Sequence, residues 1–585
     1  MRKNPLLTLF SSPVRISWTL LLLMTAVFFF RPVETGDIWW HLKAGEYIYT
    51  HKVVPLLDPF PTSGEKTLWV LTQWLGSLVY YLAFHAAGPL GLKVLRVLII
   101  LLSLWQLRRF GGQRDVAPLL PFLGFLLLMA VATRPHLRPF LFNLLFIQVM
   151  LGALLTFHKT ARAVALWPVV LIAPLWVNIH MGSFVYGFTL IGVFLMTAAV
   201  EAYTQGRSWR RVGWLGGLTG LYALAFLVNP YGIQGALHPL RTLFVPDYLN
   251  FELIKAAISE LQPPRLMTGA YLWFWPTLIL GGAAVYWDRA GRFRNTILLA
   301  CGLFMFLYGQ RAALFFALIC LYLFIEACGP ELVRRITAKK RVLWGTHAIL
   351  YLLIIFVTAG YFQQKVFWNG RIERCVAMSE AYTSPGPILD DLAWEKTSGI
   401  VFNDDAYGGY ILWHYYPQLR PFADTRQINI TNFQLFNLIL NDPHRYWNYS
   451  DLQQRIAVVL LDADKVVNWK LIRYLQSRDD WHLSAVQGSQ LLFRRGKKED
   501  GLLAYKRELR AHDSQLEDFR RELEALVQAG PRHKVRYVHM EPADSAMTLF
   551  ELGYRGAALE RLLYSFRISN SPYQHAIARL ILKNL

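Results

Sequence analysis

The stretch Gly36-Asp37-Ile38-Trp39-Trp40-His41-Leu42-Lys43-Ala44-Gly45-Glu46 follows the first apolar segment of the chain, residues 16–30. That segment predicts a helix that enters a bilayer, so the stretch is expected where the chain leaves the membrane. It places the carboxylate of Asp37 among aromatic side chains at the membrane surface. A carboxylate in that position is a candidate general base.

The composition indicates a polytopic membrane protein. The chain has 585 residues, 54% of them hydrophobic, and its apolar runs approach the roughly 20 residues that a helix needs to cross the hydrocarbon core. Because lipid-exposed backbone must satisfy its own hydrogen bonds, these runs predict α-helices. The formal net charge is +21, but many Lys and Arg residues lie in short loops between apolar runs, where they orient the helices. We therefore interpret the charge as topology and expect no nucleic acid partner.

The basic loops predict which ends of the helices face the cytoplasm. They place the N-terminus in the cytoplasm. Four loops then lie on the other side of the cytoplasmic (inner) membrane, as in a multi-pass protein: those that hold Asp37, residues 134–138, residues 178–180 and residues 229–232. The scheme requires residues 74–105 to cross once, with a break at Gly88-Pro89. It predicts eleven helices, near residues 16–30, 89–106, 116–133, 140–157, 164–180, 184–202, 214–228, 270–287, 296–310, 312–328 and 343–362.

The composition changes after residue 362, and we expect three domains. These are a transmembrane domain over 1–362 with its first extracytoplasmic loop at 31–73, an extracytoplasmic α/β domain over 363–497, and a helical region over 498–585. Residues 399–403 and 457–462 have the pattern of buried strands. Residues 544–585 predict two helices around a turn at 569–572, similar to one tetratricopeptide-type hairpin. A single hairpin of this type has to pack on the domain or on a protein partner.

Asp37 and His41 are the candidate catalytic residues. If residues 38–50 form a helix, the two side chains lie four positions apart on one face, and an acid and an imidazole can meet one substrate. The alternative is that Asp37 caps this helix while the tryptophans serve as interfacial anchors.

Three further motifs lie in the loops on the same side. Arg134, His136 and Arg138 are candidates for binding a phosphate, although arginines at helix ends also snorkel to the interface. Asn178 and His180 are candidate substrate-binding residues or hydrogen-bonded structural groups. The Asn-Pro-Tyr-Gly motif at 229–232 is first of all a turn that ends a helix.

In the α/β domain, two acidic segments follow a predicted strand, where such folds expose functional loops. The alternatives are that Asp404 caps the next helix and that Asp424 and Arg426 form a local ion pair. The candidate substrate-binding residues of this domain are Asp404, Asp405, Tyr407, Asp424 and Arg426.

An acidic residue just after the first helix, followed by an aromatic/His pattern, resembles the signature of the GT-C membrane glycosyltransferases. The resemblance covers residues 18 to about 232 and includes the motifs at 37–41, 178–180 and 229–232. It implies that Asp37 is the catalytic acid and that the donor sugar comes from a polyprenyl-phosphate carrier. Many members carry a second acid beside the first, whereas Ile38 stands here, so a divalent metal is left open and Glu34, Glu46 or Asp58 are substitutes. The segment after residue 401 is similar to the acceptor-binding part of oligosaccharyltransferase catalytic subunits.

The leading hypothesis is therefore a glycosyltransferase that uses a polyprenyl-phosphate-linked sugar and a glycan, lipid or protein acceptor at the membrane lipid surface. A second hypothesis is a non-catalytic scaffold of the same fold for cell-envelope polysaccharide assembly or export. A transporter predicts charges within several helix centres and internal repeats, whereas the predicted helix interiors here are almost free of charge and no duplication of halves is apparent. Glycoside hydrolysis requires a pair of carboxylates at a defined separation, which a sequence does not give.

Overall fold

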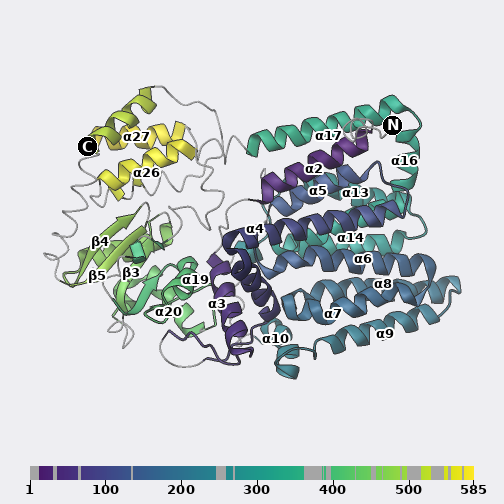
Figure 1. Ribbon diagram of the computed structural model, residues 1–585, viewed down its shortest axis with the longest axis horizontal. Helices are drawn as coiled ribbons and strands as arrows, with labels where there is room; N and C mark the ends of the chain where they lie inside the picture. The colour runs from purple at the N-terminus through teal and green to yellow at the C-terminus, as the bar shows by residue number, and fades with distance from the viewer. Residues whose placement is uncertain are drawn as a thin grey trace. The chain divides into compact units, whose positions relative to one another are not determined.

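The computed structural model divides the chain into two compact units, which are described separately (Figure 1). The helical unit comprises Met1–Val33, Ala44–Leu56 and Val70–Phe362, and the sheet unit comprises Glu34–Lys43, Leu57–Trp69 and Gln363–Leu585. The structure describes residues 12–30, 36–62, 67–133, 136–245, 259–267, 271–361, 385–386, 388–390, 397–428, 430–448, 456–463, 465–487, 490–496, 516–528, 546–547, 549–550, 555–568 and 572–585. The three-domain division stays a prediction.

The helical unit is built mainly from apolar helices, and each of the eleven predicted ranges overlaps one of its helices. Their bounds are α2 Pro13–Phe29, α4 Trp74–Gly112, α5 Leu120–Ala132, α6 Asn143–Thr160, α7 Trp167–His180, α8 Phe184–Gln205, α9 Arg210–Ala225, α10 Gly232–Phe244, α13 Phe274–Trp287, α14 Arg292–Tyr308, α15 Ala313–Ala327, α16 Gly329–Thr337 and α17 Lys340–Tyr361. Within the described residues, six helical stretches are long and apolar enough to cross a membrane. The protein is therefore polytopic, and the count of eleven crossings stays a prediction.

Helix α15 forms the centre of this bundle. Every side chain from Ala313 to Ile325 is buried, and α5, α6, α13 and α14 pack around it. A helix that is apolar on all sides has no face suited to water, so in a bundle it takes the position with the most neighbours.

The predicted break in α4 is confirmed. Ala87 and Gly88 have non-helical dihedrals, with φ of +56° at Gly88, and Pro89 follows directly. Proline lacks the N–H that would continue the helix, and glycine adopts a positive φ without steric cost.

Past the break, α4 carries two buried cations, Lys93 and Arg96, that the sequence scheme passes over although both lie in a predicted span. The Arg96 Nε donates a hydrogen bond to the Phe29 carbonyl at 2.7 Å, and the Lys93 Nζ lies 5.7 Å from the Phe30 ring centre. Both cations therefore meet the C-terminal end of α2, where the helix dipole is negative. The expectation that helix interiors are almost free of charge is wrong at these two positions.

The sheet unit contains a five-stranded mixed sheet in the order β2-β1-β3-β5-β4. Strand β1 (Gly399–Asn403) pairs in parallel with β2 (Leu419–Pro421) and β3 (Ile456–Asp462), and β5 (Gln490–Arg495) pairs antiparallel with β3 and β4 (Trp481–Gln487). Both predicted strands are confirmed, β3 beginning one residue earlier than expected. The helices that join the strands are α19 Asp405–His414, α20 Ile430–Asn441, α21 Pro443–Tyr446 and α23 Trp469–Ser477.

Both faces of this sheet are covered. Ile400 and Phe402 belong to one apolar cluster, while Val401 between them belongs to another on the opposite face. Because successive strand residues point to opposite faces, a continuous apolar run such as that of β1 requires cover on both sides.

The C-terminal region forms helices that share one apolar cluster. A helix over residues 516–528, α26 (Arg555–Ile568) and α27 (Pro572–Asn584) contribute Leu523, Leu562, Phe566 and Ile581 to it. Ala558 of α26 also belongs to a cluster of the sheet, so the helices pack on their own unit, as expected of a hairpin that cannot bury its own face. Residues 569–571 of the predicted turn lie outside the described residues. The tetratricopeptide-type assignment and a protein partner stay predictions.

Candidate functional site

The N-terminal turn of α3 (Gly36–His51) lies directly against α19, which confirms the helix expected over residues 38–50. A Cβ on Gly36 would lie 2.5 Å from the Ala406 carbonyl oxygen, and a Cβ on Gly409 would lie 2.5 Å from the Gly36 carbonyl oxygen. No side chain fits at that distance from a backbone atom, so the contact requires glycine on both helices. Trp39 packs edge-on against Tyr410, with ring centres 5.0 Å apart.

This contact brings two of the predicted acids onto adjoining turns. Asp37 follows Gly36 and Asp405 precedes Ala406, the two residues that meet. Asp37 is half-buried in the first turn of α3. His41, one turn further along the same face, is buried, and its ring lies tilted against that of Trp40 with ring centres 3.6 Å apart. The sequence keeps Asp37 and Asp405 in separate motifs, and only the helix contact joins them.

Asp404 and Asp405 stand at the carboxyl end of β1 beside Lys465, which follows β3. The Lys465 Nζ lies 2.5 Å from Asp404 Oδ1 and 3.8 Å from Asp405 Oδ1. Asp404 also caps α19 by accepting from the Ala406 N–H at 3.1 Å, so the capping alternative is confirmed as its structural role. The Asn468 Nδ2 donates to Asp404 Oδ2 at 3.3 Å.

Lys465 and Asn468 are not singled out by sequence reasoning, although both follow a predicted strand. Strands β2 and β3 flank β1 on opposite sides, so the chain turns in opposite directions beyond the ends of β1 and β3. Such a switch point is where parallel α/β sheets bind ligands. The residues directly after the strand predicted over 457–462 could therefore have been named as candidates from the sequence.

Burial, and after it the charge of Asp404, raise the pKa of the Asp405 carboxyl to about 6 against the opposing effect of Lys465. Burial lowers the pKa of Lys465, but Asp404 and Asp405 outweigh it and the net shift is upward. Asp405 therefore exchanges its proton near pH 6, whereas Lys465 stays charged. A carboxyl group in that range is suited to proton transfer.

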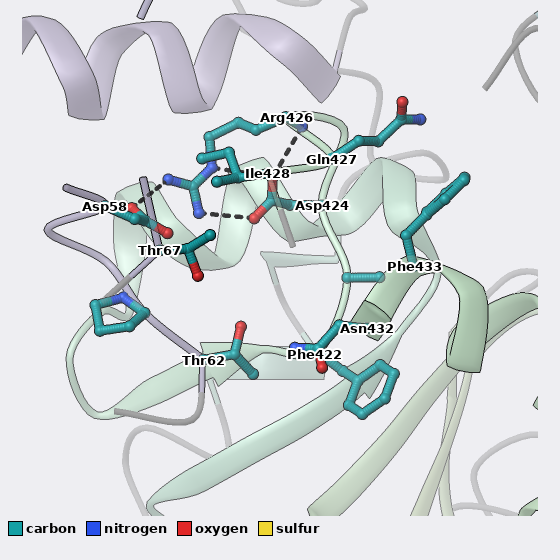
Figure 2. Close-up of a pocket in the computed structure, with 12 residues that line it drawn as sticks. Asp58, Thr62, Thr67, Phe422, Asp424, Arg426, Gln427, Ile428, Asn432 and Phe433 are labelled. Atoms are coloured by element: carbon teal, nitrogen blue, oxygen red, sulfur yellow. Dashed lines mark hydrogen bonds and ion pairs between the residues drawn. The ribbon is translucent and has the colours of Figure 1, made fainter. Parts of the chain in front are cut away.

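Arg426 forms the centre of a second cluster (Figure 2). Its Nη2 lies 2.8 Å from Asp424 Oδ2, which confirms the local ion pair, and its Nη1 lies 2.8 Å from Asp58 Oδ1 in the first loop. The guanidinium carbon lies 5.0 Å from the Trp69 ring centre, and the arginine side chain is only 3% exposed. Two carboxylates and an aromatic ring thus occupy most of the guanidinium of Arg426, which the sequence marks as a candidate substrate-binding residue.

A small pocket opens beside this cluster (Figure 2). It lies between Asp58–Thr67 of the first loop, called the first-loop segment below, and Phe422–Phe433, which follow β2. Its lining includes Asp58, Thr62, Thr67, Asp424, Asn432 and Phe433. Tyr407, the remaining predicted residue of this unit, is 6% exposed and packs in the cluster of Val401 and Ile411. Its predicted substrate contact is not supported by that position and stays a prediction.

In the helical unit, the motifs at 178–180 and 229–232 hold the two ends of the first-loop segment. The Tyr231 hydroxyl donates to the Pro55 carbonyl at 2.8 Å and accepts from the Leu71 N–H at 3.0 Å. The Trp74 Nε1 donates to Asn178 Oδ1 at 2.6 Å, and the Asn178 Nδ2 donates to the Val228 carbonyl at 2.7 Å. The turn and the asparagine therefore have structural roles.

His180 and the predicted phosphate-binding residues lie in the same unit. The His180 Nδ1 is 2.7 Å from Ser183 Oγ, and the histidine is buried. His136 is half-buried, and Arg134 lies outside the described residues.

Arg138 is joined to a second arginine through one carboxylate. Its Nη1 pairs with Glu260 Oε1, and the Arg311 Nε lies 3.2 Å from Glu260 Oε2. Arg311 remains 42% exposed and Arg138 28%. The group carries a net charge of +1, so it is suited to an anion. Glu260 and Arg311 lie more than 120 residues from Arg138, and no sequence pattern links them.

A metal-binding cluster is not found in the described part of the chain, where no three His, Cys, Asp or Glu residues lie close enough to hold an ion. Asp58, one of the substitutes that the sequence offers for the second acid, is bound by Arg426. Glu34 lies outside the described residues. We assign no step to a metal.

In the described part of the chain, a bundle of apolar helices is followed by an α/β unit. Among solved structures, the fold is similar to that of the archaeal oligosaccharyltransferase AglB from Archaeoglobus fulgidus, both in complex with an inhibitory peptide and a dolichol-phosphate and in the apo form. These matches have a TM-score of 0.50 at 12% and 13% identity, and cover 77% of this chain and 69% and 70% of theirs. The resemblance to the GT-C superfamily is confirmed for the fold.

A further match is ArnT from Cupriavidus metallidurans bound to undecaprenyl phosphate, with a TM-score of 0.46 at 11% identity over 82% of this chain and 97% of that one. No protein-family model and no curated protein sequence matches the chain.

Proposed function

We propose that the protein is a membrane glycosyltransferase that moves a sugar from a polyprenyl-phosphate carrier to an extracytoplasmic glycan, lipid or protein acceptor. The observation that carries the proposal is the contact through Gly36 and Gly409, which holds the acid-bearing turn of α3 against the first turn of α19. Two carboxylates on adjoining turns, one with a pKa near 6, are suited to proton transfer on a hydroxyl. The fold similarity to AglB supports the same class of protein.

Asp37 is the general base in this proposal. It takes the proton of the acceptor hydroxyl while the hydroxyl oxygen forms a bond to the anomeric carbon. The bond between that carbon and the phosphate oxygen breaks, and the lipid phosphate leaves with the electron pair. His41, one turn away on α3, is the second group of the catalytic pair, and Asp405 holds the acceptor beside Asp37.

We assign the binding of the carrier's phosphate to arginines of the helical unit. Arg138 and Arg311 share the single carboxylate of Glu260, so their combined charge is not cancelled. An anion that binds both arginines makes charge-assisted hydrogen bonds, the strongest class available to a phosphate. Arg134 and His136 belong to the same predicted loop and are assigned to the same role.

The test is transfer of labelled sugar by the purified full chain in lipid. A panel of polyprenyl-phosphate sugars is supplied as donor, with total membrane and periplasmic fractions as acceptors. Asp37→Asn is expected to lower transfer by about 10²- to 10⁴-fold, the usual contribution of a positioned acid or base. Asp518→Asn, at a side chain 73% exposed on the helix over residues 516–528, is the matched control.

Equal transfer by wild type and Asp37→Asn would overturn the role of Asp37. Absence of transfer by folded wild-type protein that still retains a polyprenyl lipid would favour the alternative function, a non-catalytic scaffold for cell-envelope polysaccharide assembly or export.

A further inference from the structure

Helix α10 exposes a row of large apolar side chains. Ile233, Leu237 and Leu240 are 65%, 37% and 41% exposed. Residues three and four positions apart lie on one face of a helix, so these side chains form a continuous stripe, called the α10 stripe below. Contiguous apolar side chains of this kind on a surface mark a contact with lipid or with another part of a protein.

The opposite side of α10 packs on the helical unit. Gly235 and Pro239 are buried, and Ala236 packs against the apolar core of the bundle. A Cβ on Gly235 would collide with the Asn229 Oδ1, so glycine is required where α10 packs on the turn at 229–232. The α10 stripe therefore points away from the bundle.

Polar side chains border the stripe along one side. Each of them follows a stripe residue directly in the sequence: Gln234 and Arg241 are exposed, and His238 is half-buried. Residues 232–244 contain no acidic residue. A helix with one apolar face and a neutral to basic border is suited to lie in the plane of a membrane surface, where the apolar face enters the acyl chains and an arginine reaches the lipid phosphates.

The neighbouring part of the chain favours lipid as the occupant of the stripe. Helix α10 has 13 residues and is about 20 Å long, too short to cross a hydrocarbon core of roughly 30 Å. It begins at Gly232, directly after α9, which is one of the predicted crossings. Leu224 and Val228, at the end of that crossing, are each 58% exposed, as expected of side chains that face acyl chains. Figure 1 shows α10 at the end of the bundle opposite to α16.

The residue before α10 holds both ends of the first-loop segment. The Tyr231 hydroxyl bonds to the Pro55 carbonyl and to the Leu71 N–H, and the Tyr231 N–H donates to Asn229 Oδ1 at 2.8 Å. Tyr231 is thus fixed on one side to the turn and on the other to the loop. Because α10 starts at the next residue, a membrane contact of this helix also determines the depth of the loop ends.

We propose that α10 lies in the lipid interface at this end of the bundle, with the α10 stripe among the acyl chains and Arg241 at the lipid phosphates, and that this contact fixes the depth of the first-loop segment. The partner is the phospholipid surface itself. The inference does not depend on the proposed transferase function, and neither of its tests requires sugar transfer.

The first test places a nitroxide on the full chain in phospholipid nanodiscs. The label is attached at Leu240→Cys in the stripe, or at Gln234→Cys on the polar border as the matched control, in a variant whose four native cysteines are replaced by alanine. Electron paramagnetic resonance then compares its accessibility to molecular oxygen, which concentrates among acyl chains, and to a nickel chelate, which stays in water. We expect the Leu240 label to favour oxygen and the Gln234 label to favour the chelate.

Two results of this test would overturn the lipid contact. Access of the chelate to both labels would mean that the stripe faces water. Exclusion of both reagents from the Leu240 label would mean that protein covers the stripe, whether residues 246–258, the sheet unit or a second copy of the chain.

The second test examines the depth of the loop in a chain that keeps its cysteines. Leu237→Glu/Leu240→Glu places two charges in the stripe and should expel α10 from the acyl chains. Hydrogen exchange of the Leu71 amide is then expected to rise about fivefold or more, the usual effect of losing one hydrogen bond. Gln234→Glu, with its charge on the polar border, should exchange as the wild type does. Equal exchange in the double variant and this control would overturn the coupling to the loop, and Leu240→Gln repeats the measurement if the double variant does not fold.

Discussion

The Nη1 of Arg426 lies 2.8 Å from Oδ1 of Asp58, although 368 positions separate the two residues in the sequence. The same guanidinium binds Asp424 and lies near the rings of Trp69 and Phe60, whose centres are 5.0 and 5.7 Å away. A segment of the first loop is thereby fixed to the segment after β2 by a buried ion-pair group. This relationship explains why the first loop divides between the two compact units instead of belonging to one.

Arg426→Leu should destabilise the sheet unit strongly. Removal of the cation leaves Asp58 and Asp424 buried without their partner, and breaking a buried pair in this way costs about 3–5 kcal/mol. Thermal unfolding of the purified protein should show a clear fall in Tm relative to Arg520→Leu, a control at an arginine 46% exposed. The triple variant Asp58→Asn/Asp424→Asn/Arg426→Leu should recover part of the loss, because no charge then remains unpaired. A Tm for Arg426→Leu equal to that of the control would show that the cluster does not stabilise the unit.

Gly409→Ala should separate α3 from α19. The added methyl carbon would lie 2.5 Å from the Gly36 carbonyl, and backbone cannot move aside as the end of a side chain can. Overpacking of this kind costs about 1–3 kcal/mol. We expect a lower Tm and a loss of sugar transfer, since Asp37 moves with Gly36.

Gly217→Ala is the control for that variant, because a Cβ there meets nothing within 4 Å. Alanine in a helix interior is more favourable than glycine, so this variant should be neutral or slightly more stable. Transfer by Gly409→Ala at the wild-type rate would argue against the helix contact as part of the site.

Asp405→Asn should change how stability depends on pH. The pKa of Asp405 rises from 3.8 to about 6 on folding, chiefly by burial and then by the charge of Asp404. Because the folded state holds the proton more tightly, the contribution of Asp405 to stability is complete below about pH 4 and is lost as pH rises through 6. The variant should therefore gain stability relative to wild type between pH 4 and 6, on the order of 1 kcal/mol once solvent screening is considered. A constant difference between the two unfolding curves across this range would contradict the raised pKa.

Tyr231→Phe should loosen the first-loop segment at both ends. The hydroxyl bonds to Pro55 and Leu71 are both lost, and each leaves a backbone group without its partner. We expect faster hydrogen exchange of the Leu71 amide and a destabilisation of about 1–3 kcal/mol. Tyr203→Phe, at a side chain 85% exposed, is the control. Unchanged exchange at Leu71 would show that the turn at 229–232 does not hold the loop.

Arg311→Gln should weaken binding of polyprenyl phosphate by about tenfold, the loss expected for one charge-assisted hydrogen bond. Glu260 would then neutralise Arg138, and the net positive charge of the group would disappear. Binding to the protein in nanodiscs is the measurement, and Arg289→Gln at an exposed arginine is the control. If both variants bind the lipid equally, the anion site lies elsewhere.

Several features could be predicted because they depend on neighbours in the sequence. Gly88-Pro89 breaks α4, the apolar run at 399–403 forms a buried strand, and Asp404 caps the helix that follows it. Proline geometry, strand patterning and capping are local, so a few residues suffice to specify them. The Asp424–Arg426 pair follows from the same proximity.

Other features depend on which distant segments meet. Arg311 becomes part of an anion site only because Glu260 joins it to Arg138, and Lys465 reaches Asp404 only because β3 lies beside β1. No local sequence pattern marks Arg311 or Lys465 as a site residue. The buried pair Lys93 and Arg96 is different, since two cations within a predicted span are visible in the sequence and signal a buried polar contact.

By itself the sequence determined that the chain is an apolar helical bundle followed by an α/β unit, that a helix over 38–50 would set Asp37 and His41 one turn apart, and where strands β1 and β3 lie. Periodicity and hydrophobicity act along the chain and fix such elements. Only the tertiary structure decided that the turn carrying Asp37 packs against the turn carrying Asp405, that Asp58 shares Arg426 with Asp424, and that the motifs at 178–180 and 229–232 hold the first loop. Those relationships arise from close packing, in which a missing Cβ or one buried charge selects a partner hundreds of residues away.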